Sequence, residues 1–153
     1  MALRLEDLTQ DNRGLVVQIP RSKTDQEGKG QSVSVIRGGH YCPVNALEHW
    51  LKLSRITEGP LFRRVFRGGK LGQESLSAYS VALIVKRWAR QAGLNSEEFA
   101  GHSLRSGFLT SAAKNKASLF KMMEVSRHKD PKTVMRYVRD AEIFEDHAGE
   151  GLL

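Results

Sequence analysis

The sequence has a single cysteine, Cys42, which excludes an internal disulfide framework. One thiol suits the reducing cytosol, and we therefore predict a cytoplasmic protein. No Cys/His pair recurs at the spacing of zinc ligands, so we expect no metal site. Apolar runs are also short: no window approaches 18 uninterrupted apolar residues, and the first 14 residues lack a secretory-type apolar segment. We expect neither a membrane span nor a secretory leader.

Acidic side chains are outnumbered, with 17 Asp and Glu against 24 Lys and Arg, a net charge of +7 and a pI near 9.8. Such an excess favours a polyanionic partner. The segment from His102 to Arg139 carries nine basic and two acidic residues, a net of +7, whereas residues 140–153 carry five acids and no Lys or Arg. A charge run alone more often marks a solvated face than a binding site, so this segment needs a second signal.

The pattern of the 153 residues predicts one soluble domain, without repeats or a dividing linker. Residues 14–20 and 31–37 are rich in β-forming residues, and the polar connector between them indicates a β-hairpin tip. Helices are predicted at 43–56, 78–92, 102–115, 118–128 and 131–144, and a loop at 59–72. Together these features predict an α+β fold that is mostly α-helical, with one small antiparallel β-sheet.

Local signals set the ends of these predicted helices. Pro43 stands at a plausible first helical position, and Asp130-Pro131 reads as an N-cap followed by a first residue. Ser77 and Ser118 are candidate N-caps, and Gly93 fits a C-terminal cap.

His102 and Arg105 are three residues apart, so on a helix they project from one face about a turn from each other. A guanidinium beside an imidazole can grip a phosphate, the arginine through its planar fork and the histidine through one further donor. With 14 arginines in the chain, coincidental pairs at this spacing are expected, and a surface arginine on a helix N-terminus remains the simpler interpretation.

Tyr137 follows His128 by nine residues, and Pro131 between them predicts that the histidine precedes a helix that contains the tyrosine. An ordinary tyrosine packs its ring and leaves its hydroxyl in water. A phenol becomes a nucleophile when cationic neighbours stabilise its anion or a base takes its proton. Arg136, Arg139 and the proposed phosphate-gripping pair could create that environment.

The chain carries, in this order, a lysine in the predicted β-hairpin, an H-x-x-R motif, a histidine, and a tyrosine nine residues after that histidine. In this order of motifs it resembles the tyrosine recombinases of the phage integrase family. The likeness covers nearly the whole chain. "HSLRSGF" is similar to the family's second box, and "SRHKDPKTVMRYVR" to its third. "IPRSKTDQEGKG" resembles the strand–turn–strand that carries a catalytic lysine. All three in order are far more specific than any one alone.

The resemblance implies transesterification of DNA without a metal or other cofactor. Tyr137 would attack a phosphodiester, form a 3′-phosphotyrosyl link and release a 5′-hydroxyl. Arg105, His102 and His128 would neutralise and hydrogen-bond the phosphate oxygens. Lys23 would protonate the leaving 5′ oxygen, with Lys29 as a rival in the same connector.

The basic residues around these boxes are predicted to bind the DNA backbone; they are Arg21, Lys129, Lys132, Arg136 and Arg139. The expected partner is double-stranded DNA, on which the protein would form a homo-oligomer. The acidic tail, residues 140–153, is either a frayed terminus or a segment that docks on a neighbouring protomer, as it can in relatives, with Ile143 and Phe144 as anchor. It could also compete with DNA for the basic face.

The chain departs from the family pattern in two places. Relatives carry another catalytic arginine upstream of a segment like "ALRLEDL", with which this chain begins, so we expect a catalytic domain truncated at its N-terminus. Loss of one phosphate-binding arginine would cost roughly 2.7–4 kcal/mol of transition-state stabilisation, and we expect weak or no cleavage from this chain. Arg127 also stands where many relatives have glycine before the histidine.

Two other functions stay open on the sequence. One is a non-catalytic DNA-binding remnant of an integrase, which keeps the basic face but never forms the covalent link. The other is a type IB topoisomerase-like relaxation of supercoiled DNA, which uses the same chemical groups.

Overall fold

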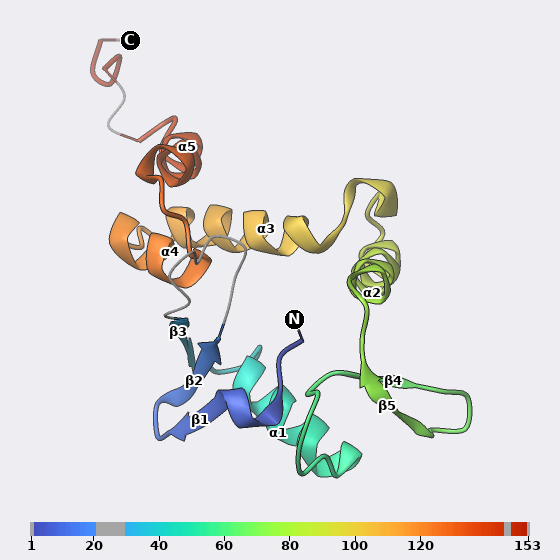
Figure 1. Cartoon of the computed structure of the whole chain (residues 1–153). Coiled ribbons are helices and arrows are strands. Elements are labelled where there is room, and N and C mark those ends of the chain that lie inside the picture. The colour runs from blue at the N-terminus through green and yellow to red at the C-terminus, as the bar shows by residue number, and fades with distance from the viewer. Residues whose placement is uncertain (1, 21–29, 146–147, 153) are drawn as a thin grey trace. The chain divides into compact units, whose positions relative to one another are not determined.

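A computed structural model describes residues 2–20, 30–145 and 148–152 (Figure 1). The chain forms two compact units, the first ending at Ser77 and the second beginning at Ala78. The first holds both small antiparallel sheets and one α-helix, and the second is helical. The prediction of a mostly helical α+β protein is confirmed. None of the helices in the described ranges is long and apolar enough to cross a lipid bilayer.

The larger sheet of the first unit has three antiparallel strands in the order β1 (Leu8–Asp11), β2 (Gly14–Ile19) and β3 (Gln31–Ile36), preceded by the short 3-10 helix η1 (Leu5–Asp7). Strands β2 and β3 confirm the predicted hairpin, with Val17 opposite Val33. Strand β1 was not predicted. Glycine is required at Gly14, because a Cβ there would lie 2.1 Å from the carbonyl oxygen of Val35.

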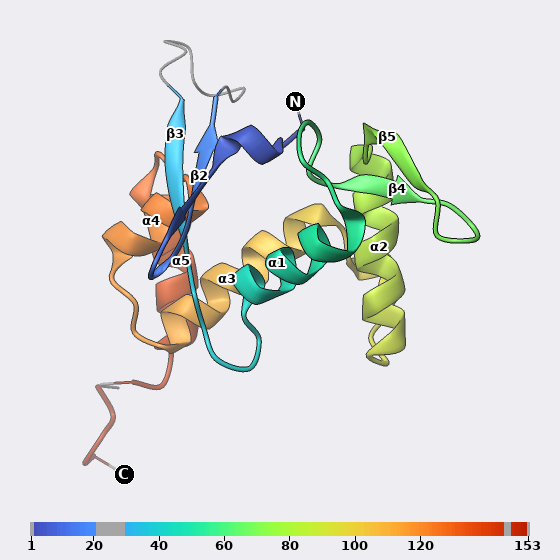
Figure 2. The ribbon, with the colours of Figure 1, turned by 90° about the horizontal axis from the view of Figure 1, so that it is seen from below.

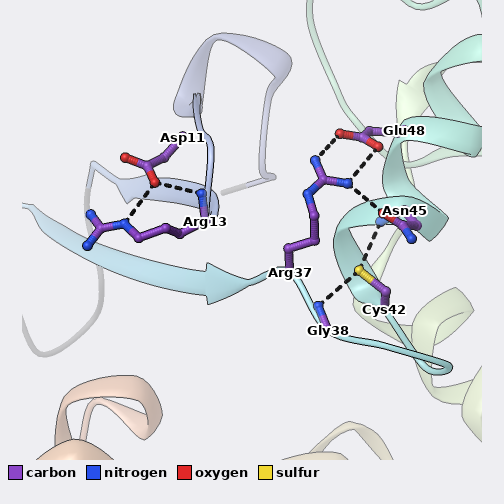
Figure 3. Close-up of polar contacts among 7 residues, drawn as sticks. All are labelled: Asp11, Arg13, Arg37, Gly38, Cys42, Asn45 and Glu48. Carbon is purple, nitrogen blue, oxygen red and sulfur yellow. Dashed lines mark hydrogen bonds and ion pairs between the residues drawn. The ribbon is translucent and has the colours of Figure 1, made fainter.

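Helix α1 (Pro43–Ser54) lies against β3, and the buried core here consists of Leu15, Cys42 and Val44, with Val35 of β3 packed against it. Pro43 occupies the first turn as predicted, and the Cys42 sulfur accepts the amide hydrogen of Asn45 at 3.4 Å as the N-cap. Figure 3 shows how the end of β3 is tied to this helix. The Arg37 guanidinium donates to Asn45 Oδ1 at 2.6 Å and to Glu48 Oε1 at 2.6 Å.

Residues 59–72, predicted as a loop, contain most of a second hairpin, β4 (Arg63–Val65) and β5 (Leu71–Ser75). The prediction of a single sheet was therefore wrong. The turn contains Gly68 and Gly69, with φ of 84° and 82°, a left-handed conformation that glycine adopts without steric cost. The same two glycines are the reason why the sequence predicts a loop here.

The second unit contains α2 (Ala78–Gln91), the 3-10 helix η2 (Ser96–Glu98), α3 (Gly101–Lys114), α4 (Leu119–Ser126) and α5 (Pro131–Ala141). Helices α3, α4 and α5 pack on one another, as both ribbon views show (Figures 1 and 2). Their common core consists of Leu109, Ala113, Met122 and Val134, each at most 3% exposed.

The helix ends in this unit agree with the local signals. Ser118 caps α4 by accepting the amide hydrogen of Lys121, and Asp130 caps α5 by accepting that of Lys132. Gly93 takes a φ of 75° just beyond α2. Helix α5 ends at Ala141, three residues before the predicted end at Phe144.

Candidate active site

Arg105 and His102 lie on the first turns of α3, which begins at Gly101. Both side chains are exposed, and the helical spacing places them about one turn apart on the same side of α3, as predicted. The described structure gives His102 no hydrogen bond to Arg105, His128 or Tyr137. His102 therefore joins the site through its position on the helix rather than through a direct contact.

His128 lies in the short turn between α4 and α5. The preceding Arg127 ends α4 in the left-handed conformation, with φ 58° and ψ 36°. This turn is closed by the Arg127 amide, which donates to the Glu124 carbonyl at 3.3 Å, and by the His128 amide, which donates to the Met123 carbonyl at 3.2 Å. The left-handed residue thus reverses the chain while keeping the histidine next to α4.

The imidazole of His128 meets two polar side chains at the same nitrogen. Its Nδ1 is 2.8 Å from the Ser126 hydroxyl and 3.3 Å from Nη2 of Arg105. Burial lowers the pKa of His128, and the nearby Arg105 charge lowers it further. Arg105 and His128, 23 residues apart in sequence, are thereby brought together as predicted.

Tyr137 lies in the second turn of α5, and its ring packs against the core cluster of α3, α4 and α5. The hydroxyl is not enclosed by apolar groups, because it donates a hydrogen bond to Ser106 Oγ at 3.3 Å. Ser106 directly follows Arg105 on α3. The phenol therefore ends beside the residue that adjoins the arginine, on a neighbouring helix.

Basic side chains form a stripe along the exposed side of α5, at Lys132, Arg136 and Arg139. Their spacing of four and three residues places them on one helix face, away from the buried Val134. Lys129 is also exposed and immediately follows His128. In the acidic tail, Glu145 pairs with Lys116, which follows α3, at 2.9 Å.

Three predicted residues lie outside the described residues: the general-acid candidate Lys23, its rival Lys29, and the DNA-binding candidate Arg21. Their roles stay predictions.

Two serines at the site were missed by sequence reasoning. Ser106 accepts the hydroxyl hydrogen of Tyr137, and Ser126 contacts the ring of His128. Serine is common, and neither position has a local pattern that marks it. The packing of α3 against α5 brings the Ser106 hydroxyl to the phenol, and the turn at Arg127 brings the Ser126 hydroxyl to the imidazole two residues further on.

The described groups can bind an anion and present a nucleophile to it. Helix α3 supplies a guanidinium and an imidazole, the α4–α5 turn supplies a second imidazole, and α5 supplies a phenol. All four groups lie within the segment 102–139, whose net charge is +7. Guanidinium and imidazolium donors suit the oxygens of a phosphate, and a phenol can attack phosphorus once its proton is removed.

The fold matches part of a solved recombinase structure. It matches the crystal structure of XerH site-specific recombinase bound to palindromic difH substrate, a post-cleavage complex, with a TM-score of 0.71 and 22% identity over 98% of this chain and 40% of that chain. The pre-cleavage complex of XerH with difH matches with a TM-score of 0.65 and 23% identity over 94% of this chain and 39% of that one.

The chain belongs to the phage integrase family, whose model matches residues 1–142. It is 41% identical over 148 residues to the integrase/recombinase xerD homolog of Selenomonas ruminantium, covering 95% of this chain and 43% of that protein. The resemblance inferred from the three boxes is confirmed. The chain spans about two fifths of the length of the relatives it matches, with 43% and 40% covered.

Proposed function

We propose that this chain is the catalytic part of a site-specific DNA recombinase that cleaves and rejoins DNA through a 3′-phosphotyrosyl intermediate. The observation that carries the proposal is that Arg105 of α3 contacts His128 of the α4–α5 turn, while Tyr137 of α5 is hydrogen-bonded to Ser106, the residue after Arg105. Membership of the phage integrase family supports it, as do the names of the relatives: an integrase/recombinase, and a recombinase bound to its DNA substrate.

In this mechanism, the Tyr137 oxygen attacks the phosphorus of a DNA phosphodiester. The new bond joins the phenolic oxygen to phosphorus, the bond from phosphorus to the 5′ oxygen breaks, and the phenolic proton passes to a base. The 5′ oxygen leaves as a hydroxyl with a proton from Lys23. The phosphotyrosyl link retains the energy of the diester, so a second 5′-hydroxyl can reverse the reaction and rejoin the strands.

Arg105, His102 and His128 stabilise the phosphate as charge accumulates on its non-bridging oxygens. A guanidinium can donate two parallel hydrogen bonds to phosphate, and each imidazolium can donate one more. Removing a single donor of this kind costs roughly 2.7–4 kcal/mol of transition-state stabilisation, on the order of a hundredfold to a thousandfold in rate. We therefore assign to Arg105 the largest share among the described residues.

The hydrogen bond from Tyr137 to Ser106 holds the phenol beside Arg105 before DNA binds. Attack requires the phenolic proton to leave, so this bond has to break or the serine has to pass the proton on. At 3.3 Å the bond is long, and long hydrogen bonds are weak, so its loss costs little.

The proposed partner is double-stranded DNA, held through its backbone by Lys129, Lys132, Arg136 and Arg139, together with Arg21. Recombination joins strands from two duplexes, so we further propose that the protein acts as a homo-oligomer on DNA. Ile143 and Phe144, which are 64% and 87% exposed, are the proposed anchor for docking of the tail on a neighbouring protomer.

Covalent capture tests the proposed function. The chain is incubated with a library of random-sequence duplexes, each nicked a few nucleotides 3′ of a candidate position. Cleavage then releases a short fragment that diffuses away and leaves the protein attached to the DNA. SDS-resistant adducts are counted for the wild type, for Tyr137→Phe, which removes only the nucleophilic oxygen, and for Tyr79→Phe, a matched control at an exposed tyrosine of α2.

In line with the weak cleavage expected from the sequence, we expect few adducts from the wild type, equally few from Tyr79→Phe, and none from Tyr137→Phe. DNA binding without adducts would refute cleavage by this chain and favour the non-catalytic DNA-binding module. Relaxation of supercoiled plasmid that lacks any captured site, dependent on Tyr137, would favour the topoisomerase-like activity instead.

The role of Lys23 has a separate test. In a captured site, the 5′-bridging oxygen is replaced by sulfur, which leaves as a thiolate and needs no proton. The Lys23→Ala variant is expected to lose cleavage of the ordinary site and to regain it on the sulfur-substituted site, whereas Arg105→Ala is inactive on both. Equal losses of Lys23→Ala on the two sites would exclude it as the general acid, and rescue of Lys29→Ala instead would assign the role to Lys29.

A further inference from the structure

Ser126 is one of two buried polar residues in the described chain, with an exposure of 6%. It is the last residue of α4 and lies two positions before His128. Its hydroxyl has two partners, the carbonyl oxygen of Met122 at 2.5 Å and Nδ1 of His128 at 2.8 Å. A hydroxyl that is enclosed in this way is oriented by its hydrogen bonds, because burial without them is costly.

The serine hydroxyl has only one hydrogen, and the Met122 carbonyl can only accept. The Ser126 hydroxyl therefore donates its hydrogen to the Met122 carbonyl oxygen, 2.5 Å away. The serine oxygen can then only accept a hydrogen bond from the imidazole. A hydrogen bond at 2.8 Å between Oγ and Nδ1 then requires the hydrogen to be on Nδ1. The network thus selects the tautomer of His128 that is protonated at Nδ1.

The second neighbour of Nδ1 does not alter this assignment. Arg105 can only donate, and its Nη2 is 3.3 Å from Nδ1, a longer contact than that of the serine. If Nδ1 accepted from Arg105, the serine would have to turn its hydrogen to the ring and leave the Met122 carbonyl without its side-chain partner. The guanidinium keeps its other donors for a ligand.

We propose that Ser126 is a positioning residue that fixes the Nδ1–H tautomer of His128, so that Nε2 is the ring atom that meets the phosphate. Both polar contacts of the ring within the described chain are made by Nδ1, so Nε2 remains for a ligand. This inference rests on the proposed function for its ligand, but the tautomer itself is a property of the free chain.

The tautomer decides what the imidazole can do. With Nδ1–H fixed, the neutral ring presents a lone pair at Nε2. When a proton binds there, Nε2–H donates to a non-bridging oxygen while Nδ1–H still donates to the serine. A ring with the hydrogen on Nε2 and a bare Nδ1 could no longer donate to the serine, and only the longer contact with Arg105 would then hold Nδ1. Fixing ring orientation through the second nitrogen is the same device that orients catalytic and metal-binding histidines.

The test reads the tautomer directly, by nitrogen-15 NMR of the full chain above the pKa of its histidines. The His128 signals are assigned by their loss in His128→Gln. We expect the Nδ1–H form as the majority in the wild type. In Ser126→Ala we expect it to become the minority, because the Nε2–H form is favoured for an unconstrained histidine side chain in water.

Two further variants separate positioning from general destabilisation. Ser126→Thr keeps a hydroxyl and is expected to keep the Nδ1–H majority. Ser118→Ala removes a serine hydroxyl from the same helix, where it caps α4 without contacting His128, and is expected to leave the tautomer unchanged. The loss of the cap should lower the stability of α4, so this variant reproduces the effect of a weakened α4.

An Nε2–H majority in the wild type overturns the proposal, as does an unchanged Nδ1–H majority in Ser126→Ala. A shift in Ser118→Ala as large as in Ser126→Ala also overturns it, because the tautomer would then report helix stability. None of these outcomes depends on DNA cleavage, so absence of covalent adducts would refute the proposed function and leave the tautomer result standing.

Discussion

At Arg127 the backbone is left-handed, with φ 58°, although the residue carries a Cβ. That conformation costs a non-glycine residue roughly 1–2 kcal/mol. The sequence analysis identified Arg127 as a departure from the family pattern, which has glycine before this histidine. The turn forms with Arg127 in this strained conformation, and the imidazole of His128 lies next to Arg105.

Arg127→Gly is expected to raise the free energy of unfolding by about 1 kcal/mol, less than the full strain because glycine also loses more backbone entropy on folding. Urea denaturation measures the difference. Arg127→Ala is the matched control: it removes the same side-chain contacts but keeps the Cβ, so it should not stabilise. A gain of the same size in both variants would show that the side chain, not the backbone, is responsible.

The lowered pKa of His128 makes folding depend on pH. Burial and the Arg105 charge place the folded-state pKa below the ordinary value of about 6.5 that applies to the unfolded chain. Between the two values the unfolded state binds more protons, so stability is full above about pH 6.5 and is lost as the pH falls through the folded-state pKa.

His128→Gln should therefore lose less stability than the wild type between pH 7.5 and pH 5. Chemical denaturation at a series of pH values gives the two curves. Parallel curves over this range would mean that His128 does not titrate differently in the folded and unfolded states.

At the scale of elements, helix α5 combines a buried side with the basic stripe of Lys132, Arg136 and Arg139. A stripe that contacts DNA phosphates releases one counterion for each contact, and the slope of log affinity against log salt reports their number. If the stripe only faces water and does not contact DNA, removing one of its charges would leave that slope unchanged.

Lys132→Gln and Arg136→Gln are each expected to weaken DNA binding across sequences and to reduce the salt slope by about one. Lys114→Gln, on the exposed last turn of α3, removes the same charge away from the stripe and should leave the slope unaltered. Fluorescence anisotropy at several salt concentrations gives these slopes. If all three variants changed the salt slope equally, the stripe would act on DNA binding only through its contribution to the net charge of the protein.

Elements with local signals were predictable from sequence, and elements without them were not. Ser118, Asp130 and Pro131 mark helix starts by groups that satisfy free backbone amides or that fit the first turn, and the structure uses all three. Strands β1, β4 and β5 are three to five residues long, and their pairing depends on partner strands that cannot be identified from the local sequence. The contact of Ser106 with Tyr137 depends likewise on α3 packing beside α5, whereas the contact of Ser126 with His128 depends on the conformation of the turn between them.

At the scale of the whole molecule, charge is separated along the chain. The basic segment 102–139 has a net charge of +7 and is followed by the acidic tail of net −5. The tail is tied to the helical unit by the ion pair between Glu145 and Lys116, whose side chains are 55% and 74% exposed. Exposed pairs of this kind contribute at most about 1 kcal/mol, so the tail can be released at little cost.

Deletion of residues 142–153 is expected to tighten DNA binding several-fold at low salt, because the tail competes with phosphates for the basic segment. The gain should fade as salt screens both interactions. Glu145→Gln breaks only the ion pair and should give a small part of the effect. Equal affinities and slopes for the deleted and full chains would exclude competition by the tail.

The prediction of a single catalytic domain rests on the length of the chain and on the absence of a dividing linker, and it stays a prediction. The structure has two compact units that meet in sequence at Ser77 and Ala78. All described members of the site belong to the second unit, and the predicted lysine belongs to the first.

The central claim is that the oxygen of Tyr137 becomes bonded to a DNA phosphate. Captured protein–DNA adducts are digested with protease and nuclease, and the linked peptide is sequenced by tandem mass spectrometry. We predict a nucleotide attached through its 3′ phosphate to Tyr137, and to no other residue. A link at another side chain, or at Tyr137 through a 5′ phosphate, would contradict the account.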